Sequence, residues 1–171
     1  MLSVGGWRIF WNCRDMKAEV VLVFGRICSG KSSFQSQAYR IVVSNIVRDL
    51  MKSDNREVLQ NSMHLDERIA EDVIGVIDAT TVCIEKGIIQ RKAVIVDGIR
   101  QSTIVDKILE WYPDATLVWL DVPEAKRKLR YENRKDNKDT ESFETADNKP
   151  IELECQKIYS IFSKQLKVRN N

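Results

Sequence analysis

Eight residues, Gly25 to Ser32, constrain this chain more than any other part of it, because they read G-R-I-C-S-G-K-S. In the matching pattern G-x-x-x-x-G-K-[S/T], backbone N–H groups surround phosphates, the lysine reaches the outer phosphates and the final hydroxyl binds Mg²⁺. The apolar run Glu19–Phe24 precedes it, as expected of a buried parallel strand. Residues 32–39 lack Gly and Pro and are predicted to form a helix. The residues expected to hold a nucleoside triphosphate are Gly25, Arg26, Ile27, Cys28, Ser29, Gly30, Lys31, Ser32 and Ser33, with Ser32 also a metal ligand.

Length and composition indicate one soluble globular domain. The chain has 171 residues, of which 43% are hydrophobic and 30% charged. Its net charge of +2 does not by itself demand a nucleic acid or a membrane as partner. No apolar run approaches the roughly 20 residues that a membrane span needs. We therefore expect no membrane partner, and the cysteine pattern described next indicates a cytoplasm-like compartment.

The four cysteines are scattered and form no C-x-x-C pair, which indicates reduced thiols rather than a disulfide framework or a zinc site. Cys28 lies inside the phosphate loop, where a helix terminus and Lys31 would lower its pKa. It is either an oxidation-sensitive thiol or a small residue that fills the loop.

Residues 1–15 stand apart from the rest. They are either an N-terminal extension or the product of a start placed too early, because Met16 lies just before the first predicted strand. Residues 16–171 are predicted to form a single domain.

Helical and strand-like stretches alternate along that domain, which predicts an α/β fold with a parallel sheet of four or five strands flanked by helices in three layers. Gly87 is predicted to cap one long helix, and residues 135–149 are predicted to form a polar loop. The expected further strands are Val42–Ser44, Ala93–Asp97 and Ala115–Leu120. The expected further helices are 45–52, 66–86, 103–111, 123–134 and 151–168, the last leaving no evident fifth strand.

A carboxylate and a guanidinium follow one buried strand. Asp97 ends the run V-I-V-D, and Arg100 comes three residues later. Ligands of open α/β sheets bind at the carboxyl ends of the strands. Asp97 is therefore a candidate metal ligand or catalytic carboxylate and Arg100 a candidate substrate-binding residue, although an Asp-Gly pair is also common in simple turns.

Three cations are spaced along the helix expected after Pro123. Arg130 and Arg134 are four residues apart, and Lys126 lies one turn earlier. Such a face suits the spread charge of a phosphoryl group in transfer, but a solvated charged surface explains it equally well. Arg48, at a strand-to-helix junction, is a weaker candidate for holding an acceptor.

Taken in order, these segments resemble the adenylate-kinase-like nucleoside monophosphate kinases. The phosphate loop matches theirs, and Ser44–Arg48 (S-N-I-V-R) is similar to their G-D-M-L-R, with Asn45 in place of Asp. Asp97–Arg100 (D-G-I-R) is similar to D-G-F-P-R but one residue shorter, a form also seen in dephospho-coenzyme-A kinases and phage deoxynucleotide kinases. Asp121–Pro123 matches D-V-P.

The spacing of Arg130 and Arg134 after D-V-P also matches this family. The resemblance implies an ATP- and Mg²⁺-dependent kinase in which Lys31, Asp97, Arg130 and Arg134 serve catalysis and Arg48 and Arg100 hold the acceptor phosphate. It further implies acceptor-binding helices at about 45–90 and a short lid at about 130–149. Because residue 45 and the segment 97–100 differ from the family's motifs, the resemblance does not determine which nucleotide is the acceptor.

We expect an acceptor that is a small nucleotide, such as a deoxynucleoside monophosphate. One alternative is a hydroxyl of a modified base, such as hydroxymethylpyrimidine, in DNA. Another is a nucleotide-binding switch protein that transfers nothing, although such a protein has no need for the four arginines.

Overall fold

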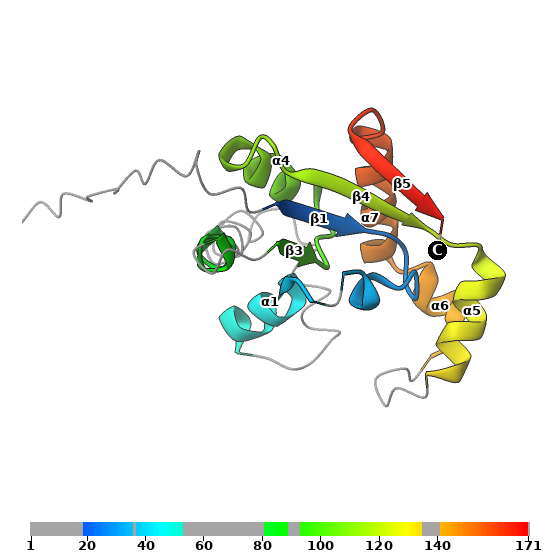
Figure 1. Cartoon of the computed structure of the whole chain (residues 1–171). Coiled ribbons are helices and arrows are strands. Elements are labelled where there is room, and N and C mark those ends of the chain that lie inside the picture. The colour runs from blue at the N-terminus through cyan, green and yellow to red at the C-terminus, as the bar shows by residue number, and fades with distance from the viewer. Residues whose placement is uncertain (1–18, 36, 53–80, 89–92, 135–140, 171) are drawn as a thin grey trace, which may run out of the picture.

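A parallel β-sheet forms the centre of the protein (Figure 1). The fold is known from a computed structural model, which describes residues 19–35, 37–52, 81–88, 93–134 and 141–170. The strand order is β2-β3-β1-β4-β5, and every neighbouring pair is parallel. The predicted α/β class, with one parallel sheet flanked by helices, is confirmed. The strands are β1 (Val20–Phe24), β2 (Tyr39–Val42), β3 (Val94–Asp97), β4 (Thr116–Asp121) and β5 (Leu166–Asn170).

Strand β1 lies at the middle of the sheet, and all five of its residues are buried. Val20, Leu22 and Phe24 belong to the larger core on one face, whereas Val21 and Val23 belong to the smaller core on the other. A strand covered on both faces has no polar side to present, which explains its unbroken apolar sequence.

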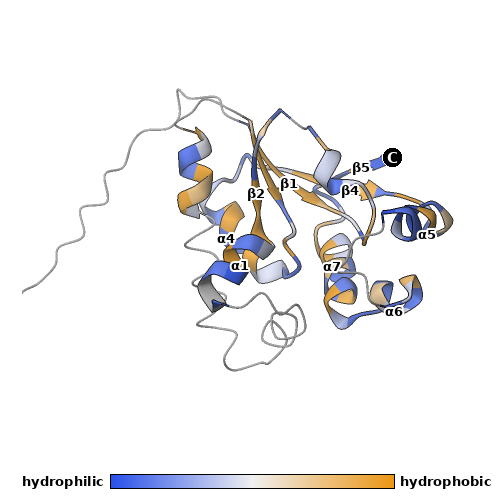
Figure 2. Ribbon diagram, turned by 90° about the horizontal axis from the view of Figure 1, so that it is seen from below, coloured by the Kyte–Doolittle hydropathy of each residue, from blue (hydrophilic) through white to orange (hydrophobic). Residues whose placement is uncertain are grey.

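The larger core lies between one face of the sheet and its helices. These are α1 (Val43–Met51), α4 (Ser102–Trp111) and α7 (Pro150–Ile161), together with helical residues 81–88. Figure 2 shows the apolar strands and the mixed polar and apolar surfaces of α1, α4 and α7. The predicted helix at 103–111 and the predicted starts of helices near Pro123 and Pro150 are confirmed.

The segment after the phosphate loop differs from the prediction. It forms only the 3₁₀ turn η2 (Lys31–Ser33), and Phe34 and Ala38 then pack on the smaller core. Serine favours turns over helix interiors, and β2 already begins at Tyr39 to pair with β3. The described residues between the loop and β2 therefore contain no α-helix.

Two further boundaries are corrected near this face. The second strand occupies Tyr39–Val42 rather than Val42–Ser44, and Val43 and Ser44 begin α1. Gly87 lies within the helical residues 81–88 and is not a cap. A Cβ at Gly87 would lie 2.6 Å from the Val94 side chain, so this glycine allows the helix to approach β3 closely.

The C-terminal part of the chain is also corrected. Helix α7 ends at Ile161, and β5 follows as a fifth strand paired with β4 along its length. Ile158, Phe162 and Leu166 are spaced as in a helix, but backbone pairing with β4 takes the last of them into a strand. The predicted loop 135–149 contains α6 (Phe143–Asp147), whose N-cap Ser142 accepts a hydrogen bond from the Thr145 N–H at 3.2 Å.

Helices α5 (Glu124–Asn133) and α6 lie at the carboxyl end of the sheet (Figure 1). Their side chains Tyr131, Phe143 and Ala146 form a third small core with Ile27 of the phosphate loop. The predicted extension 1–15 and most of the predicted helix 66–86 lie outside the described residues. Within the described part, no helix is long and apolar enough to cross a membrane.

Beside β1, the connections between strands change direction, from one edge of the sheet toward the other. The chain passes from β1 across β3 to reach β2, and from β3 across β1 to reach β4. In open parallel sheets, ligands bind at the carboxyl ends of the strands where the direction of the connections reverses. The phosphate loop, directly after β1, lies at this position.

Candidate phosphate-binding site

The phosphate loop leaves β1 through a backbone shape that only a few residue types accept. Gly25 and Gly30 have φ values of 145° and 89°, and Cys28 has a φ of 60°. A Cβ at Gly25 would lie 2.5 Å from Ser29 Oγ and 2.9 Å from the Leu120 carbonyl oxygen. The first glycine of the motif is therefore required both by its dihedral angle and by its close contact with β4.

Lys31 folds back over this loop. Its Nζ donates hydrogen bonds to the carbonyl oxygens of Gly25 at 2.6 Å and of Arg26 at 2.9 Å. Within the described part of the chain, the N–H groups of Gly30, Lys31 and Ser32 donate to no protein acceptor. N–H groups of this kind beside an ammonium form a concave site that suits an anion. The residues therefore fit a phosphate group.

The pKa of Lys31 is lowered from its ordinary value, first by burial and second by the positive charge of Arg100. Glu152, Cys155 and Asp97 act in the opposite direction and partly offset this shift. Burial and a nearby positive charge both disfavour the charged form of an ammonium. A bound polyphosphate would favour that form.

Asp97 ends β3 beside the loop, as the sequence predicted, but it already has a partner. Arg40 Nη1 of β2 lies 3.3 Å from Asp97 Oδ2 and makes an ion pair with it. The same guanidinium donates to the Phe34 carbonyl oxygen. Arg40 could not be identified from the sequence, because the segment Y-R-I-V has no pattern that distinguishes an inward-facing arginine from an exposed one.

Arg100 forms an ion pair with a residue that no sequence motif identified. Its Nη1 lies 2.8 Å from Glu152 Oε2, in the first turn of α7. Glu152 also accepts a hydrogen bond from the Ile27 N–H of the loop at 3.1 Å. Arg100 is thereby held close enough to Lys31 to lower its pKa.

A buried charge network connects the loop with α5 and α6. The guanidinium of Arg127 binds both carboxylate oxygens of Asp147, at 2.6 and 3.1 Å. Arg26 of the loop lies 2.8 Å from the same carboxylate. Arg127 and Asp147 are both buried, although the sequence K-R-K-L-R resembled a solvated charged surface. This network attaches the loop firmly to the two helices.

The two predicted lid arginines have different surroundings. Arg130 Nη1 donates to the Cys28 carbonyl oxygen at 3.2 Å and so lies against the loop. The Arg134 guanidinium lies over the Tyr131 ring at 4.9 Å from its centre, and its side chain is exposed. The structure brings Arg130 to the loop and leaves Arg134 at the end of α5.

Arg48 lies on α1, where its Nη1 donates to Asn45 Oδ1 at 2.9 Å. No contact between Arg48 and the phosphate loop is seen in the described residues. The Ser32 hydroxyl, predicted to bind Mg²⁺, belongs to an exposed residue of η2. The roles of both residues stay predictions.

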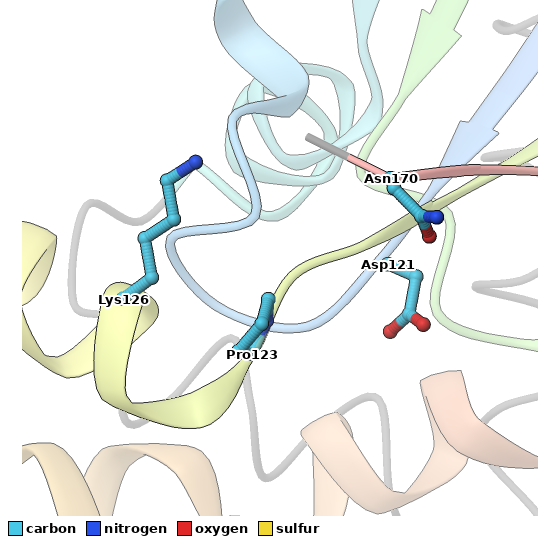
Figure 3. A pocket seen from close by; sticks show the side chains of 4 residues that line it. All are labelled: Asp121, Pro123, Lys126 and Asn170. Atoms are coloured by element: carbon cyan, nitrogen blue, oxygen red, sulfur yellow. The ribbon is translucent and has the colours of Figure 1, made fainter.

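An open cavity of about 560 Å³ lies at the carboxyl ends of β4 and β5 (Figure 3). Asp121 and Asn170 are direct partners across these two strands, and both line it. Pro123 and Lys126 line it from the start of α5. The lining residue Asp121 directly follows Leu120, whose carbonyl oxygen would lie 2.9 Å from a Cβ at Gly25 of the loop.

Comparisons with known proteins bear on the fold alone. No family model matches the chain, and no curated protein matches it. Among solved structures, TT1252 from Thermus thermophilus is similar with a TM-score of 0.50 and 14% identity, over 90% of this chain and 88% of that one. An unliganded sugar kinase from Janibacter sp. HTCC2649 aligns with a TM-score of 0.48 and 14% identity, over 85% of this chain and 95% of that one.

Proposed function

We propose that this protein is an ATP-dependent kinase that transfers the γ-phosphoryl group to a nucleotide, with a (deoxy)nucleoside monophosphate as the acceptor. One observation carries the proposal. Within the described residues, the loop presents N–H groups of Gly30, Lys31 and Ser32 without a protein acceptor, and burial and Arg100 lower the pKa of the Lys31 ammonium beside them.

The donor phosphates are assigned to this loop. The N–H groups would bind phosphate oxygens, and Lys31 would exchange the carbonyl oxygens of Gly25 and Arg26 for the outer phosphates. The cavity lined by Asp121 and Lys126 would receive the nucleoside part of ATP. Mg²⁺ would be held by the Ser32 hydroxyl, where it neutralises phosphate charge.

Arginines on two sides of Lys31 support transfer rather than binding alone. Arg130 contacts the loop from α5, and Arg100 approaches from the residues after β3. In the proposed reaction, an oxygen of the acceptor phosphate forms a bond with the γ-phosphorus. The bond to the bridging oxygen breaks, and ADP leaves with that electron pair. Fixed cations stabilise the charge that spreads over the phosphoryl oxygens.

Arg48 and Arg100 are assigned to the acceptor side, and Asp97 is assigned to the metal ion. Arg48 would bind the acceptor phosphate, and Asp97 would hold a water of the metal ion after partial exchange with Arg40. Catalysis then consists of positioning and charge stabilisation, which are the main contributions in phosphoryl transfer.

The test uses γ-labelled ATP and Mg²⁺ against a panel of acceptors: each nucleoside monophosphate and deoxynucleoside monophosphate, coenzyme-A precursors, and plain and hydroxymethylated DNA. Lys31→Ala removes the loop ammonium. Lys107→Ala is the matched control, because Lys107 is an exposed lysine that pairs only with its helix neighbour Glu110 among the contacts described.

Label that moves to a nucleoside monophosphate in the wild type and in Lys107→Ala, but not in Lys31→Ala, supports the proposal. Label that moves only to hydroxymethylated DNA replaces the acceptor class by a modified base. ATP binding without transfer to any acceptor contradicts the kinase activity and favours a nucleotide-binding switch protein.

A further inference from the structure

Glu152 is a buried carboxylate beneath the phosphate loop. It lies in the first turn of α7, and only 4% of its surface is exposed. Pro150 opens the helix at its first position, and the helix N-terminus favours a negative charge nearby. The side chain is therefore directed inward, among groups that serve the proposed reaction.

Two donors approach this carboxylate from different parts of the chain. The Ile27 N–H belongs to the phosphate loop and lies 3.1 Å from Glu152 Oε2. The Arg100 guanidinium follows β3 and lies 2.8 Å from the same oxygen. One atom thus joins the loop backbone to the arginine assigned to the acceptor side of the reaction.

The bond from Ile27 also determines which way the loop faces. Because the Ile27 N–H is directed to Glu152, it is withdrawn from the phosphates, while the N–H groups of Gly30, Lys31 and Ser32 stay available. Glu152 therefore supports the loop from its inner side.

The charge of Glu152 acts on Lys31 as well. The charges that act on the Lys31 ammonium include Arg100 after β3, Asp97 at the end of β3, and Glu152 and Cys155 on α7. Burial and Arg100 lower the pKa of Lys31, and Cys155, Glu152 and Asp97 raise it. Removal of the Glu152 charge would lower this pKa further.

We propose that Glu152 is a positioning residue, which joins Ile27 of the phosphate loop to Arg100 and so fixes the spacing between donor and acceptor phosphates. This inference rests on the proposed kinase activity. Glu152 touches neither substrate in this arrangement, and it acts through Arg100 and through the phosphate loop to which Ile27 belongs.

The test compares Glu152→Gln with Glu154→Gln. The first variant keeps an oxygen that accepts the Ile27 N–H but loses the charge that holds Arg100. The second changes a glutamate on the same helix whose described ion pair is with Lys157 at the surface. For each variant, kcat and KM are measured with the acceptor found for the wild type, and ATP affinity is measured calorimetrically from neutral to alkaline pH.

Glu152→Gln is expected to lower kcat by about tenfold or more and to raise KM for the acceptor, with ATP affinity at neutral pH changed less than about threefold. Its ATP affinity is expected to fall at a lower pH than in the wild type, because Lys31 loses a supporting charge. Glu154→Gln is expected to match the wild type in every measurement.

Three results would overturn the inference. If Glu152→Gln keeps the wild-type kcat, Glu152 does not fix the reacting groups. If kcat and ATP affinity fall together while the alkaline pH at which ATP affinity is lost stays the same, the role of Glu152 is structural only. If the wild type transfers label to no acceptor, the proposed function fails, and the positioning role fails with it. If the wild type is active and Glu152→Gln has the same kcat, only the positioning role is overturned.

Discussion

At the scale of single residues, the phosphate loop combines positive φ angles with a lysine ammonium whose charged form is disfavoured by burial and by Arg100. Lys31 rests on the carbonyl oxygens of Gly25 and Arg26, and its pKa is lowered by burial and by Arg100. A group whose folded pKa is lowered in this way binds fewer protons than the unfolded chain between the two pKa values. The protein therefore becomes more stable as the pH rises through that window.

Phosphate binding should reverse the shift at Lys31. A polyphosphate beside the ammonium raises its pKa, so ATP binding should take up protons at alkaline pH, and affinity should fall as the pH rises further. Calorimetric titration in two buffers of different ionisation enthalpy measures this uptake. Lys31→Met should abolish it, and an unchanged uptake in Lys31→Met would place the titrating group elsewhere.

Gly25 gives a second prediction at this scale. Gly25→Ala should destabilise the fold by about 1–3 kcal/mol or more, because the new Cβ meets Leu120 backbone at 2.9 Å as well as an unfavourable φ. Gly98→Ala is the matched comparison, since its φ is also positive, 88°, but its nearest atoms lie at 3.8 Å. Urea denaturation should rank Gly25→Ala as the more harmful change. The reverse order would contradict the close contact with β4.

At the scale of elements, one buried carboxylate contributes to the attachment of α5 and α6 to the loop. Asp147 binds Arg127 and Arg26 together. Removing one partner of a buried pair leaves a charge without compensation, which is far more costly than losing a surface pair.

Asp147→Asn should therefore destabilise the protein by about 3–5 kcal/mol. Glu144→Gln, on the same helix, should change stability little, because its pair with Lys128 is exposed. Thermal and urea unfolding of both variants measure the difference. Equal effects of the two changes would show that the buried network does not hold these elements together.

The elements that could be predicted from sequence are those decided by their own residues. The strands at β3 and β4 carry unbroken apolar runs, and α4 carries apolar residues at helical spacing. The turn after the loop and the strand β5 could not be predicted, because pairing with β3 and β4 overrides local preference there. Short α6 has too few residues to show a period.

Some residues of the candidate site could be predicted from the sequence, and others could not. A motif identifies Lys31 and the loop glycines, and spacing after D-V-P identifies Arg130. Arg40, Arg127, Asp147 and Glu152 were missed, because a charged residue in sequence carries no mark of burial. Only the fold shows that these charges are paired inside the protein.

At the scale of the whole molecule, stability is expected to decrease from the middle of the sheet to its edge. β1 is buried on both faces and paired on both sides, whereas four of the five residues of β5 are exposed. Amide hydrogen exchange should be slowest in β1 and faster in β5. Equal protection of the two strands would indicate that β5 is covered by a partner in solution.

The site at the end of β1 is built from a loop, helices and arginines that come from distant parts of the chain. The most direct test is a crystal structure with a non-hydrolysable ATP analogue and Mg²⁺. We expect phosphate oxygens to accept hydrogen bonds from the N–H groups of Gly30, Lys31 and Ser32, with Lys31 Nζ moved from the Gly25 and Arg26 carbonyl oxygens to the phosphates. A nucleotide bound elsewhere, or a Lys31 still on those carbonyl oxygens, would contradict it.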